Sequence, residues 1–486
     1  MMRKNLFKMK WKRAAVALTA ALILSMAVSG CGNKTVDYNV DGGSSDSNSE
    51  NGNVSENGTK KSSDSGTLAT TYGIPEECKT ELDTGNSGLD KLEIYDSDVE
   101  YPETSTMDAY YYTKEEMTSD KKKEIAETVF DKDSGIFEYD EDSPTKADIN
   151  GIIEEYEADL QRSIDNGEDD DAEYFRDAIG VYESMLDTAP DEYPAAGDYS
   201  GDKFIGYMDG AEFTLDIVES SSTCRLNLKE ELASYRPSKT SDKADVCYFR
   251  TDASYEIANT CTLSESEAQT VAESFIQTLD IGDMVLSETK DLYWVYYDSS
   301  TSTDESVAIE ADGYALYFVR SVNNIPVCDK SIGNADNLSG NGGTVDIPVE
   351  SIHIYVDGNG ILYAYWSVYL APSDRESETT ELLSFDALLE KANENISEYY
   401  TDYPAFSSRI KFNSMELTYY IEETDEEGLF KYTPVWVLSE YNEYSDYSDE
   451  QYPEQMVVID ATDGEVIDLL SLSKKLGTFD EFNFEE

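Results

Sequence analysis

A single histidine limits the acid–base chemistry that this chain could perform. His353 is the only histidine among 486 residues, so a Ser–His or Cys–His nucleophilic mechanism would have to use it. The apolar residues Ile352, Ile354 and Val356 alternate onto one face of a predicted strand and leave His353 on the other face. We interpret His353 as a plain histidine on a sheet surface. Gly-x-Ser-x-Gly, P-loop, Gly-x-Gly-x-x-Gly and His-Glu-x-x-His motifs do not occur, and we predict that the chain is not an enzyme.

Carboxylates are too abundant in this sequence to identify a catalytic pair. With 102 acidic residues, a glycoside-hydrolase pair could be drawn almost anywhere, so the sequence predicts no catalytic residue and no cofactor. Two clusters, Asp131 to Gly135 and Asp165 to Asp171, are dense enough to bind Ca²⁺ weakly. Neither has the glycine and closing glutamate of an EF-hand loop, and solvated loops are the simpler interpretation of both.

The cysteines match no zinc site, because there is no Cys-x-x-Cys pair and only one histidine. Apart from Cys31 there are five, an odd number, so at least one stays unpaired within a molecule. A bridge between Cys224 and Cys247 is one option. The sequence alone does not determine the pairing among Cys78, Cys224, Cys247, Cys261 and Cys328.

The start of the chain predicts export and a lipid anchor. Residues 1–13 are basic, and an apolar run from Ala14 to Val28 follows that is too short to cross a bilayer comfortably, so residues 1–30 are predicted to be a secretory signal peptide. The four residues 28–31, Val-Ser-Gly-Cys, resemble the bacterial lipobox. This resemblance implies cleavage between Gly30 and Cys31, acylation of Cys31 and a lipoprotein held on the outer side of the cell membrane. The alternatives are an ordinary signal peptide and an uncleaved signal anchor.

The charge of the chain restricts its partners. The formal net charge is −66, with 36 basic and 102 acidic residues, which excludes nucleic acid as an expected partner. Polar partners should be cationic, such as Ca²⁺, a basic peptide or a basic patch on another protein. The simpler alternative is that acidity keeps a surface protein soluble. Hydrophobic residues make up 40% of the chain, which is enough for folded cores.

The hydrophobic patterns predict an α+β fold that begins after a disordered linker. Residues 31–72 are the lipidated cysteine and a linker rich in Ser, Gly, Asn and Asp, with little to bury. Residues 73–257 are predicted to form an N-terminal α+β domain with a helical hairpin. Its first helix is expected to be capped by Ser143 and to end at Gly167, and its second to span 171–188. Two strands around Asp209 and Gly210 are predicted to form a β-hairpin.

The rest of the chain is predicted to contain a duplicated unit of one helix packed on an antiparallel sheet. Unit 1 spans 258–378, and its helix begins with a capping box of Ser264 and Glu267. Unit 2 spans 379–475, and Ser384 caps its helix. Pro326 and Pro434 precede the closing Asp-Gly turns by similar intervals. A single larger α+β domain is the alternative, and 476–486 is an acidic tail.

Part of unit 2 resembles a PepSY module. Residues 433–437 read Thr-Pro-Val-Trp-Val, and residues 458–467 read Val-Ile-Asp-Ala-Thr-Asp-Gly-Glu-Val-Ile. In that family a strand with Pro and Trp precedes a closing hairpin, and the segment from Tyr317 to Val327 is similar to a looser copy. The overall layout is also similar to extracytoplasmic regulators of the YycH/YycI type, except that Cys31 replaces their membrane helix. The resemblance implies binding and regulation of peptidases or sensor kinases, without catalytic residues.

Tyrosine-rich strands are the best candidates for a binding surface. They are 293–297, 363–366 and Tyr419–Tyr420, in which alternation sends half of the rings away from the helix. Exposed aromatic rows suit peptide or glycan binding, whereas sheet packing is the alternative. The sequence therefore predicts a lipid-anchored binding or regulatory protein acting on another envelope component. A lipoprotein that captures peptide or carbohydrate is the second hypothesis.

Overall fold

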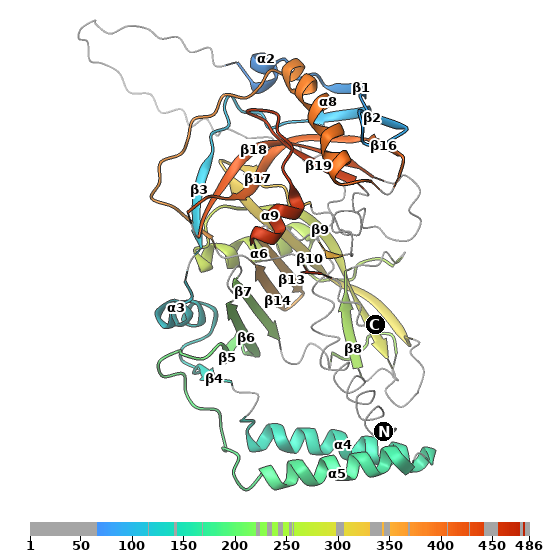
Figure 1. The fold of residues 1–486 in the computed structure, drawn as a ribbon. Helices are drawn as coiled ribbons and strands as arrows, with labels where there is room; N and C mark the ends of the chain where they lie inside the picture. Colours follow the sequence, from blue (N-terminus) through green and yellow to red (C-terminus); the bar gives the residue numbers. More distant parts are fainter. Residues whose placement is uncertain are drawn as a thin grey trace, which may run out of the picture.

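The computed structural model describes most of the chain between Gly66 and Glu481. The described residues are 66–114, 116–139, 143–167, 169–219, 224–230, 236–241, 246–251, 255, 257–297, 306–330, 343–344, 350–367, 370–405, 407–426, 428–441, 455–476 and 480–481. They form a mixed α+β fold with two large sheets, and this level of the predicted fold class is confirmed (Figure 1). The signal segment, Gly30, Cys31 and the linker to residue 65 lie outside the described residues.

The first large sheet has eight strands and combines both ends of the described chain. In order, β1, β2, β17, β18, β3 and β15 are neighbours, with β16 beside β2 and β19 beside β18. The strands are β1 (Glu77–Leu82), β2 (Lys91–Glu100), β3 (Tyr110–Lys114), β15 (Leu370–Pro372), β16 (Arg409–Phe412), β17 (Ser414–Glu423), β18 (Leu429–Glu440) and β19 (Gln455–Asp460). Their helices are α2 (Leu68–Tyr72), α8 (Phe385–Asp402) and α9 (Leu469–Leu476).

The second large sheet has ten strands and is built from the middle of the chain. The order is β4, β5, β6, β7, β14, β13, β10, β9 and β8, with β11 beside β10. The strands are β4 (Phe137–Glu138), β5 (Lys203–Met208), β6 (Ala211–Glu219), β7 (Cys224–Glu230), β8 (Val246–Arg250), β9 (Met284–Tyr297), β10 (Ala308–Val322), β11 (Ile325–Pro326), β13 (Ser351–Asp357) and β14 (Gly360–Ser367). A short separate sheet pairs β12 (Gly343–Thr344) with β20 (Asp480–Glu481).

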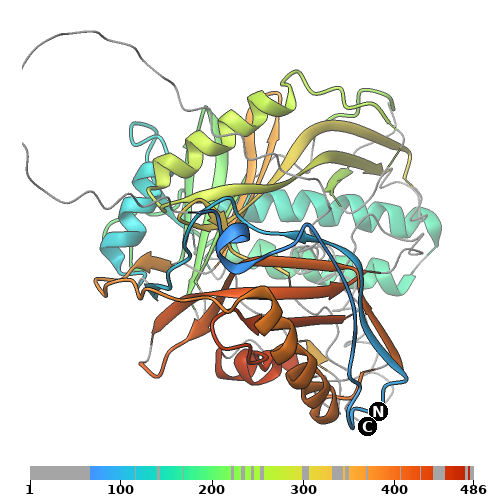
Figure 2. The same ribbon diagram turned by 90° about the horizontal axis from the view of Figure 1, so that it is seen from above.

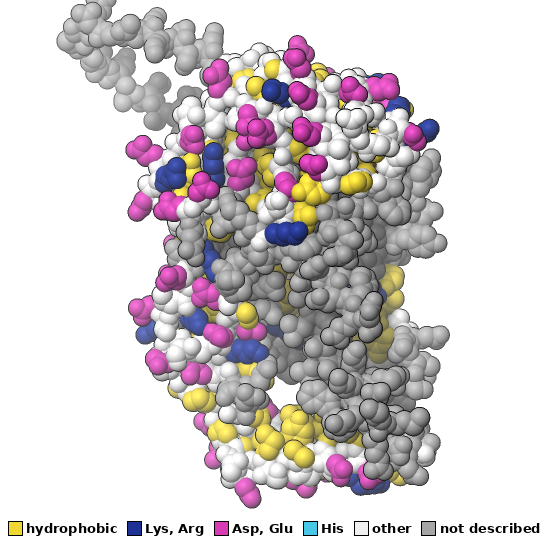
Figure 3. Space-filling view, in the orientation of Figure 1, with side chains coloured by type: hydrophobic (Ala, Val, Ile, Leu, Met, Phe, Trp, Pro, Cys, Tyr) yellow, Lys and Arg dark blue, Asp and Glu magenta, His cyan; other side chains and the backbone are white. Residues whose placement is uncertain are grey.

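Helices cover these sheets and extend beyond them. Helix α6 (Glu265–Leu279) buries Phe275 and Ile276 in the core of the ten-stranded sheet, and α3 (Ser119–Val129) joins the same core. Figure 2 shows α6 along one side of the molecule and α8 along the other. Helices α4 (Lys146–Asn166) and α5 (Asp169–Met185) pack on each other through a small core of their own and lie apart from the sheets at the bottom of Figure 1. Figure 3 shows hydrophobic side chains gathered over this helical pair.

The strand pairing divides the chain differently from the predicted domain boundaries. The predicted N-terminal domain, 73–257, contributes β1, β2 and β3 to the eight-stranded sheet, and β4 to β8 to the ten-stranded sheet. Tyr112 of β3 pairs with Phe430 of β18, more than 300 residues later. The backbone N–H and C=O groups of a buried strand need hydrogen-bond partners. A strand such as β3 finds them on a strand that lies far away in the sequence, β18. No self-contained N-terminal domain is present among the described strands.

Local signals were more accurate than the boundaries. The capping box of Ser264 and Glu267 is present, and Ser384 caps α8, as predicted. The turn at Asp209 and Gly210 joins β5 to β6 with both residues at positive φ. The predicted cap of α4 was wrong, because Thr145 rather than Ser143 accepts the free backbone N–H and forms a capping box with Asp148.

The two large sheets meet at a buried ion pair. Arg320 at the end of β10 donates from Nε to Oε2 of Glu350 at 2.6 Å, and the two residues are 1% and 0% exposed. The guanidinium also donates to the carbonyl oxygens of Ile281 at 2.9 Å and Leu370 at 3.4 Å. Leu370 opens β15 of the eight-stranded sheet, so the pair joins both sheets. Burial raises the pKa of Glu350 to about 7, against the opposing effect of Arg320.

The segment after β10 strengthens this junction. Val327 forms a parallel bridge to Tyr419, and the Cys328 N–H donates to the Tyr419 carbonyl at 2.9 Å. The Thr418 hydroxyl donates to the carbonyl of Pro326 at 2.7 Å. Residues 325–328 therefore leave the ten-stranded sheet and contact β17 of the other one.

The ion pair predicts an asymmetric response to substitution. Glu350→Met leaves a guanidinium that cannot lose its proton buried without a counter-charge, and we expect a loss of roughly 3–5 kcal/mol in unfolding free energy. Arg320→Met should cost less, because the remaining carboxyl can take up a proton. The double variant should recover most of the loss. Urea denaturation of the three variants tests this, and simple addition of the two single losses in the double variant would contradict it.

Candidate functional site

One face of the ten-stranded sheet carries a cross-strand row of aromatic side chains. Tyr317 of β10 pairs with His353 of β13, which pairs with Tyr365 of β14. The His353 ring centroid lies 4.7 Å from that of Tyr317 and 5.9 Å from that of Tyr365. Ile352 and Ile354 belong to the core that α6 covers, so the row occupies the opposite face, as the alternation predicted.

A second row and a ring from β8 extend this surface. Tyr355 stacks against Tyr363 at a centroid distance of 4.9 Å. The Phe249 ring lies edge-on to Tyr355 at 5.3 Å and 6.0 Å from Tyr363. We call the six side chains the aromatic face: Phe249, Tyr317, His353, Tyr355, Tyr363 and Tyr365. They come from β8, β10, β13 and β14, and five of them are half-buried, whereas Tyr317 is buried.

Several other predicted surface rings are in the core. Trp294, Tyr296 and Trp366 are at most 3% exposed, and Tyr293 is 6% exposed. Tyr419 and Tyr420 are fully buried, because the chain at Val327 bridges to β17 and the Tyr110 ring lies 6.3 Å from that of Tyr419. For these positions sheet packing is the correct interpretation. Tyr297, Tyr363 and Tyr365 remain half-buried.

His353 is held in a neutral state. Burial lowers its pKa to about 4, and the positive charge of Lys290 acts in the same direction. Its ring contacts in the described part of the chain are the two tyrosines of its row. The imidazole is therefore part of an aromatic surface at neutral pH and is deeper than the sheet-surface position that the sequence predicted.

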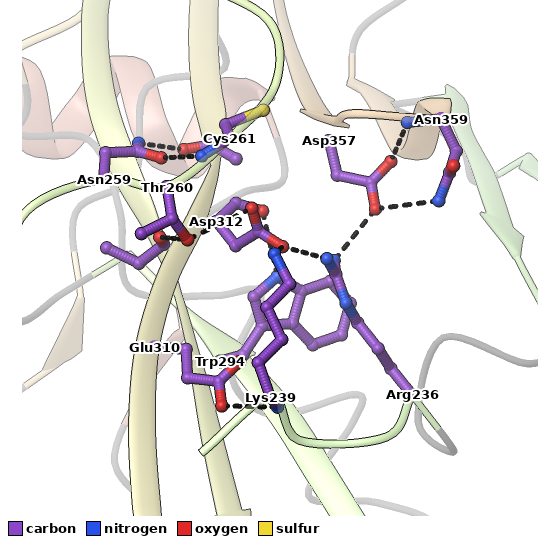
Figure 4. A network of polar contacts seen from close by, with 12 residues as sticks. Arg236, Lys239, Asn259, Thr260, Cys261, Trp294, Glu310, Asp312, Asp357 and Asn359 are labelled. Carbon is purple, nitrogen blue, oxygen red and sulfur yellow. Dashed lines mark hydrogen bonds and ion pairs between the residues drawn. The ribbon is translucent and has the colours of Figure 1, made fainter.

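A polar network lies beside the aromatic face, around a loop of residues 236–241 (Figure 4). Arg236 forks between two carboxylates: one nitrogen is 2.8 Å from Asp357 Oδ2, and the other contacts Asp312 Oδ2. Its guanidinium carbon lies 4.6 Å from the centre of the Trp294 ring. Lys239 Nζ is 2.5 Å from Asp312 Oδ2. The sequence analysis missed this network, because its members are up to 121 residues apart.

The local backbone explains where these carboxylates lie. The pairing of β10 with β9 shifts register between Ala311 and Tyr314, which places Asp312 and Gly313 in a bulge. Gly313 has φ +152°, and a Cβ there would be 2.7 Å from the Val356 carbonyl oxygen, so the bulge requires glycine. The Trp294 indole N–H donates to the Asp312 carbonyl at 3.2 Å. Asp357 ends β13, where its Oδ1 accepts the Asn359 N–H at 2.7 Å.

Glu310 is the third carboxylate of the network. One oxygen, Oε1, accepts hydrogen bonds from the Ser238 hydroxyl at 2.7 Å, the Lys239 N–H at 2.7 Å and the Thr240 N–H at 2.9 Å. Burial opposes its ionisation, but the hydrogen bonds from Ser238, Thr240 and the loop backbone outweigh burial and lower the pKa of Glu310. Glu310 is therefore ionised and ties the loop to β10.

The cysteines are the next group of residues that the sequence analysis singled out. Cys78, Cys261 and Cys328 are free thiols, and the Cys247 thiol donates to the Arg236 carbonyl oxygen at 3.6 Å. The side chain of Cys224 lies outside the described residues, so a bridge between Cys224 and Cys247 stays a prediction. Burial raises the pKa of Cys247 to about 11 and that of Cys328 to about 12, so both stay protonated.

The carboxylates proposed as weak Ca²⁺ ligands take part in local hydrogen bonds. Asp131 Oδ1 accepts the Asp133 N–H at 3.0 Å, and Oδ2 accepts the Ser134 hydroxyl at 2.9 Å. Asp165 accepts a hydrogen bond from Gln161 at 2.8 Å, on the same helix. The described residues contain no group of three or more His, Cys, Asp or Glu side chains placed to hold a metal ion.

Comparison with known proteins identifies no family for this chain. No protein-family model matches it, and no curated protein sequence matches it at a significant level. A crystal structure of an uncharacterized protein from Eubacterium rectale ATCC 33656 superposes with a TM-score of 0.38 and 13% identity, over 82% of this chain and 95% of that one. In the part of the chain that the structure describes, no helix has both the length and the apolar character needed to span a membrane.

The environment of His353 predicts its titration. Because its folded pKa is lowered to about 4 from an ordinary 6.5, the folded state favours the neutral ring, and stability from this group is lost as pH falls from about 6.5 towards 4. The chain has one histidine, so its imidazole proton resonances can be followed by NMR without assignment. We expect a midpoint near pH 4 in the folded protein and near 6.5 in urea. A folded midpoint at 6 or above would contradict the described packing.

Proposed function

We propose that this chain is a lipid-anchored, extracytoplasmic and non-enzymatic protein that binds and modulates another component of the cell envelope. The observation that carries the proposal is the aromatic face, in which four strands supply five half-buried rings and the buried ring of Tyr317. Aromatic side chains bring large contact area at low entropic cost, and they are enriched where proteins bind one another. The neutral His353 at its centre supports binding rather than acid–base catalysis.

The start of the sequence supports the location. Lipidation at Cys31 would attach two acyl chains to a polypeptide that carries a large negative charge. Two acyl chains anchor a protein stably to a membrane, whereas one acyl chain binds only marginally. The linker predicted over 31–72 ends too late in the sequence, because Leu68–Tyr72 form α2 and Leu68 is fully buried. A shorter linker, from residue 32 to residue 65, would separate the anchor from the folded part. The proposed partner is therefore another component of the cell envelope, of peptidase or sensor type, on the outer side of the cell membrane.

We further infer that the two units are related by duplication. Helix α6 precedes the antiparallel order β9, β10, β13 and β14, and α8 precedes β17, β18 and β19, with a final bridge from Ile459 to Val466. The two prolines do not occupy matching positions when the strands of the two units are compared. Pro326 lies in β11, after the end of β10, whereas Pro434 lies inside β18. The PepSY-like character and the helical hairpin of α4 and α5 belong to this proposal.

The second candidate function is capture of a peptide or carbohydrate by the same aromatic face. Stacked rings such as Tyr355 and Tyr363 suit the apolar faces of sugars as well as peptide side chains. Thermal-shift measurements with peptide and glycan libraries separate the two functions. A stabilised melt with a small ligand favours capture, whereas no shift together with a recovered protein partner favours modulation.

Removal of rings from the aromatic face should weaken partner binding. For Tyr355→Ala with Tyr363→Ala, we expect recovery of a cross-linked envelope partner by the full chain to fall at least about tenfold, as for the loss of an interface hot spot. Tyr174→Ala, in α5 and outside the aromatic face, is the matched control and should leave recovery unchanged. Equal recovery by both variants would locate the interface elsewhere.

The anchor has its own test. Cys31→Ala should abolish incorporation of labelled palmitate and release the chain from the membrane fraction, because the acyl chains supply the membrane affinity. Cys78→Ala, which removes a buried thiol, should leave both unchanged. Labelling that persists in Cys31→Ala would exclude the lipobox interpretation.

A further inference from the structure

We propose that Glu310, Asp312, Asp357 and the Trp294 ring form a binding site for an arginine side chain of a basic polypeptide segment, and that Arg236 occupies this site in the present structure as an internal stand-in. We call these four side chains the acid–aromatic site. The proposal goes beyond the aromatic face, and its readout does not need the partner of that face.

Strands β9, β10 and β13 carry the four side chains of the acid–aromatic site. Glu310, Asp312 and Asp357 are 6%, 3% and 1% exposed, on β10 and at the end of β13. The Asp357 carboxylate is oriented by the Asn359 N–H, and the backbone of Asp312 is held by the Trp294 indole. Buried carboxylates are costly unless a cation or several donors compensate them. The carboxylates on these strands therefore need a cation close to them.

In the described part of the chain, the loop of residues 236–241 supplies the cations, and it approaches the site from the surface. The cations are Arg236, whose side chain is 19% exposed, and Lys239, whose side chain is 51% exposed. Figure 4 shows both side chains reaching the carboxylates from the loop, with Arg236 beside Trp294. Exchange of Arg236 for another guanidinium would replace one set of ion pairs with an equivalent set. Such an exchange is close to balanced in free energy, because the desolvation cost of the carboxylates has already been met.

The loop leaves part of the site unsatisfied. All the hydrogen bonds that the described residues give to Glu310 reach Oε1, and Oε2 is buried without a hydrogen-bond partner. Among the described residues, the hydroxyl of Tyr296 also finds no hydrogen-bond partner, and this residue is 1% exposed. Tyr296 lies two residues after Trp294 on β9 and shares its core cluster, which places the phenol beside the same site. An unmade hydrogen bond of a buried carboxylate is expensive, so a ligand that brings a donor to Glu310 Oε2 would gain from it.

The chemistry of the site selects a guanidinium. A planar fork with five donors can contact two carboxylates at once and stack on an indole ring, as Arg236 does. A metal ion is disfavoured, since the described residues hold no cluster placed to ligate one. A chain with net charge −66 would also attract a basic segment over long range.

The test vacates the site and refills it. In the full chain carrying Arg236→Ala and Lys239→Ala, we expect methylguanidinium to raise the melting temperature and to change tryptophan fluorescence, with affinity at least tenfold higher than for the wild-type chain. An arginine-containing peptide should follow the same order. Arg375→Ala is the matched control, because Arg375 stacks 4.0 Å from the Tyr111 ring without two buried carboxylates, and it should show no such binding. Trp294→Phe, added to the vacated variant, should remove the fluorescence change.

Equal, weak binding of methylguanidinium by the vacated variant, the wild-type chain and Arg375→Ala would overturn the proposal and leave the network as a structural ion-pair cluster. If the vacated variant does not fold, the titration is made on Arg236→Lys, which keeps the charge and loses the fork. We then expect the arginine peptide to bind this variant more tightly than the wild-type chain, and equal affinities would overturn the proposal.

Discussion

The arrangement of the two sheets depends on the buried pair of Arg320 and Glu350. A guanidinium cannot escape burial by losing its proton, so its position requires Glu350 and the carbonyls that surround it. Glu350 in turn accepts hydrogen bonds from the Trp366 indole and the Leu370 N–H, both at 3.2 Å. Leu370 is the first residue of the return into the eight-stranded sheet. The geometry of one ion pair thus holds the point where the chain passes from one sheet to the other.

This acidic chain has few basic residues, and some of them form ion pairs inside the fold. With 36 basic residues against 102 acidic ones, self-repulsion favours expansion, and each buried cation offsets it locally. Lys122 of α3 binds Asp202 at 2.5 Å, and Lys330 binds Glu416 at 2.8 Å where the segment after β11 meets β17. Figure 3 shows more acidic than basic side chains on the visible described surface of the eight-stranded lobe. Against this background, the surface loop that places both Arg236 and Lys239 over carboxylates is unusual.

The sequence predicted what depends on neighbouring residues and missed what depends on distant ones. The capping box of Ser264 and Glu267, the turn at Asp209 and Gly210 and the outward position of His353 all follow from a few adjacent side chains. The pairing of β3 with β18 could not be read from the sequence, because Tyr110 to Lys114 has the pattern of any half-buried strand. The same limit hid the acid–aromatic site, whose carboxylates carry no local signature among 102 acids.

The two candidate sites share a physical connection through aromatic rings. Arg236 lies over Trp294, the Trp294 ring is 5.9 Å from Phe249, and Phe249 contacts Tyr355 of the aromatic face. Contact alone does not make sites communicate, because coupling requires an element with two states that both ligands bias. The loop of residues 236–241 would be such an element if the arginine of a ligand displaced Arg236. In one state Arg236 would pack on Trp294, and in the other state the arginine of the ligand would take its place. Coupling of this kind is reciprocal, so a partner on the aromatic face would alter arginine affinity at the acid–aromatic site by the same factor.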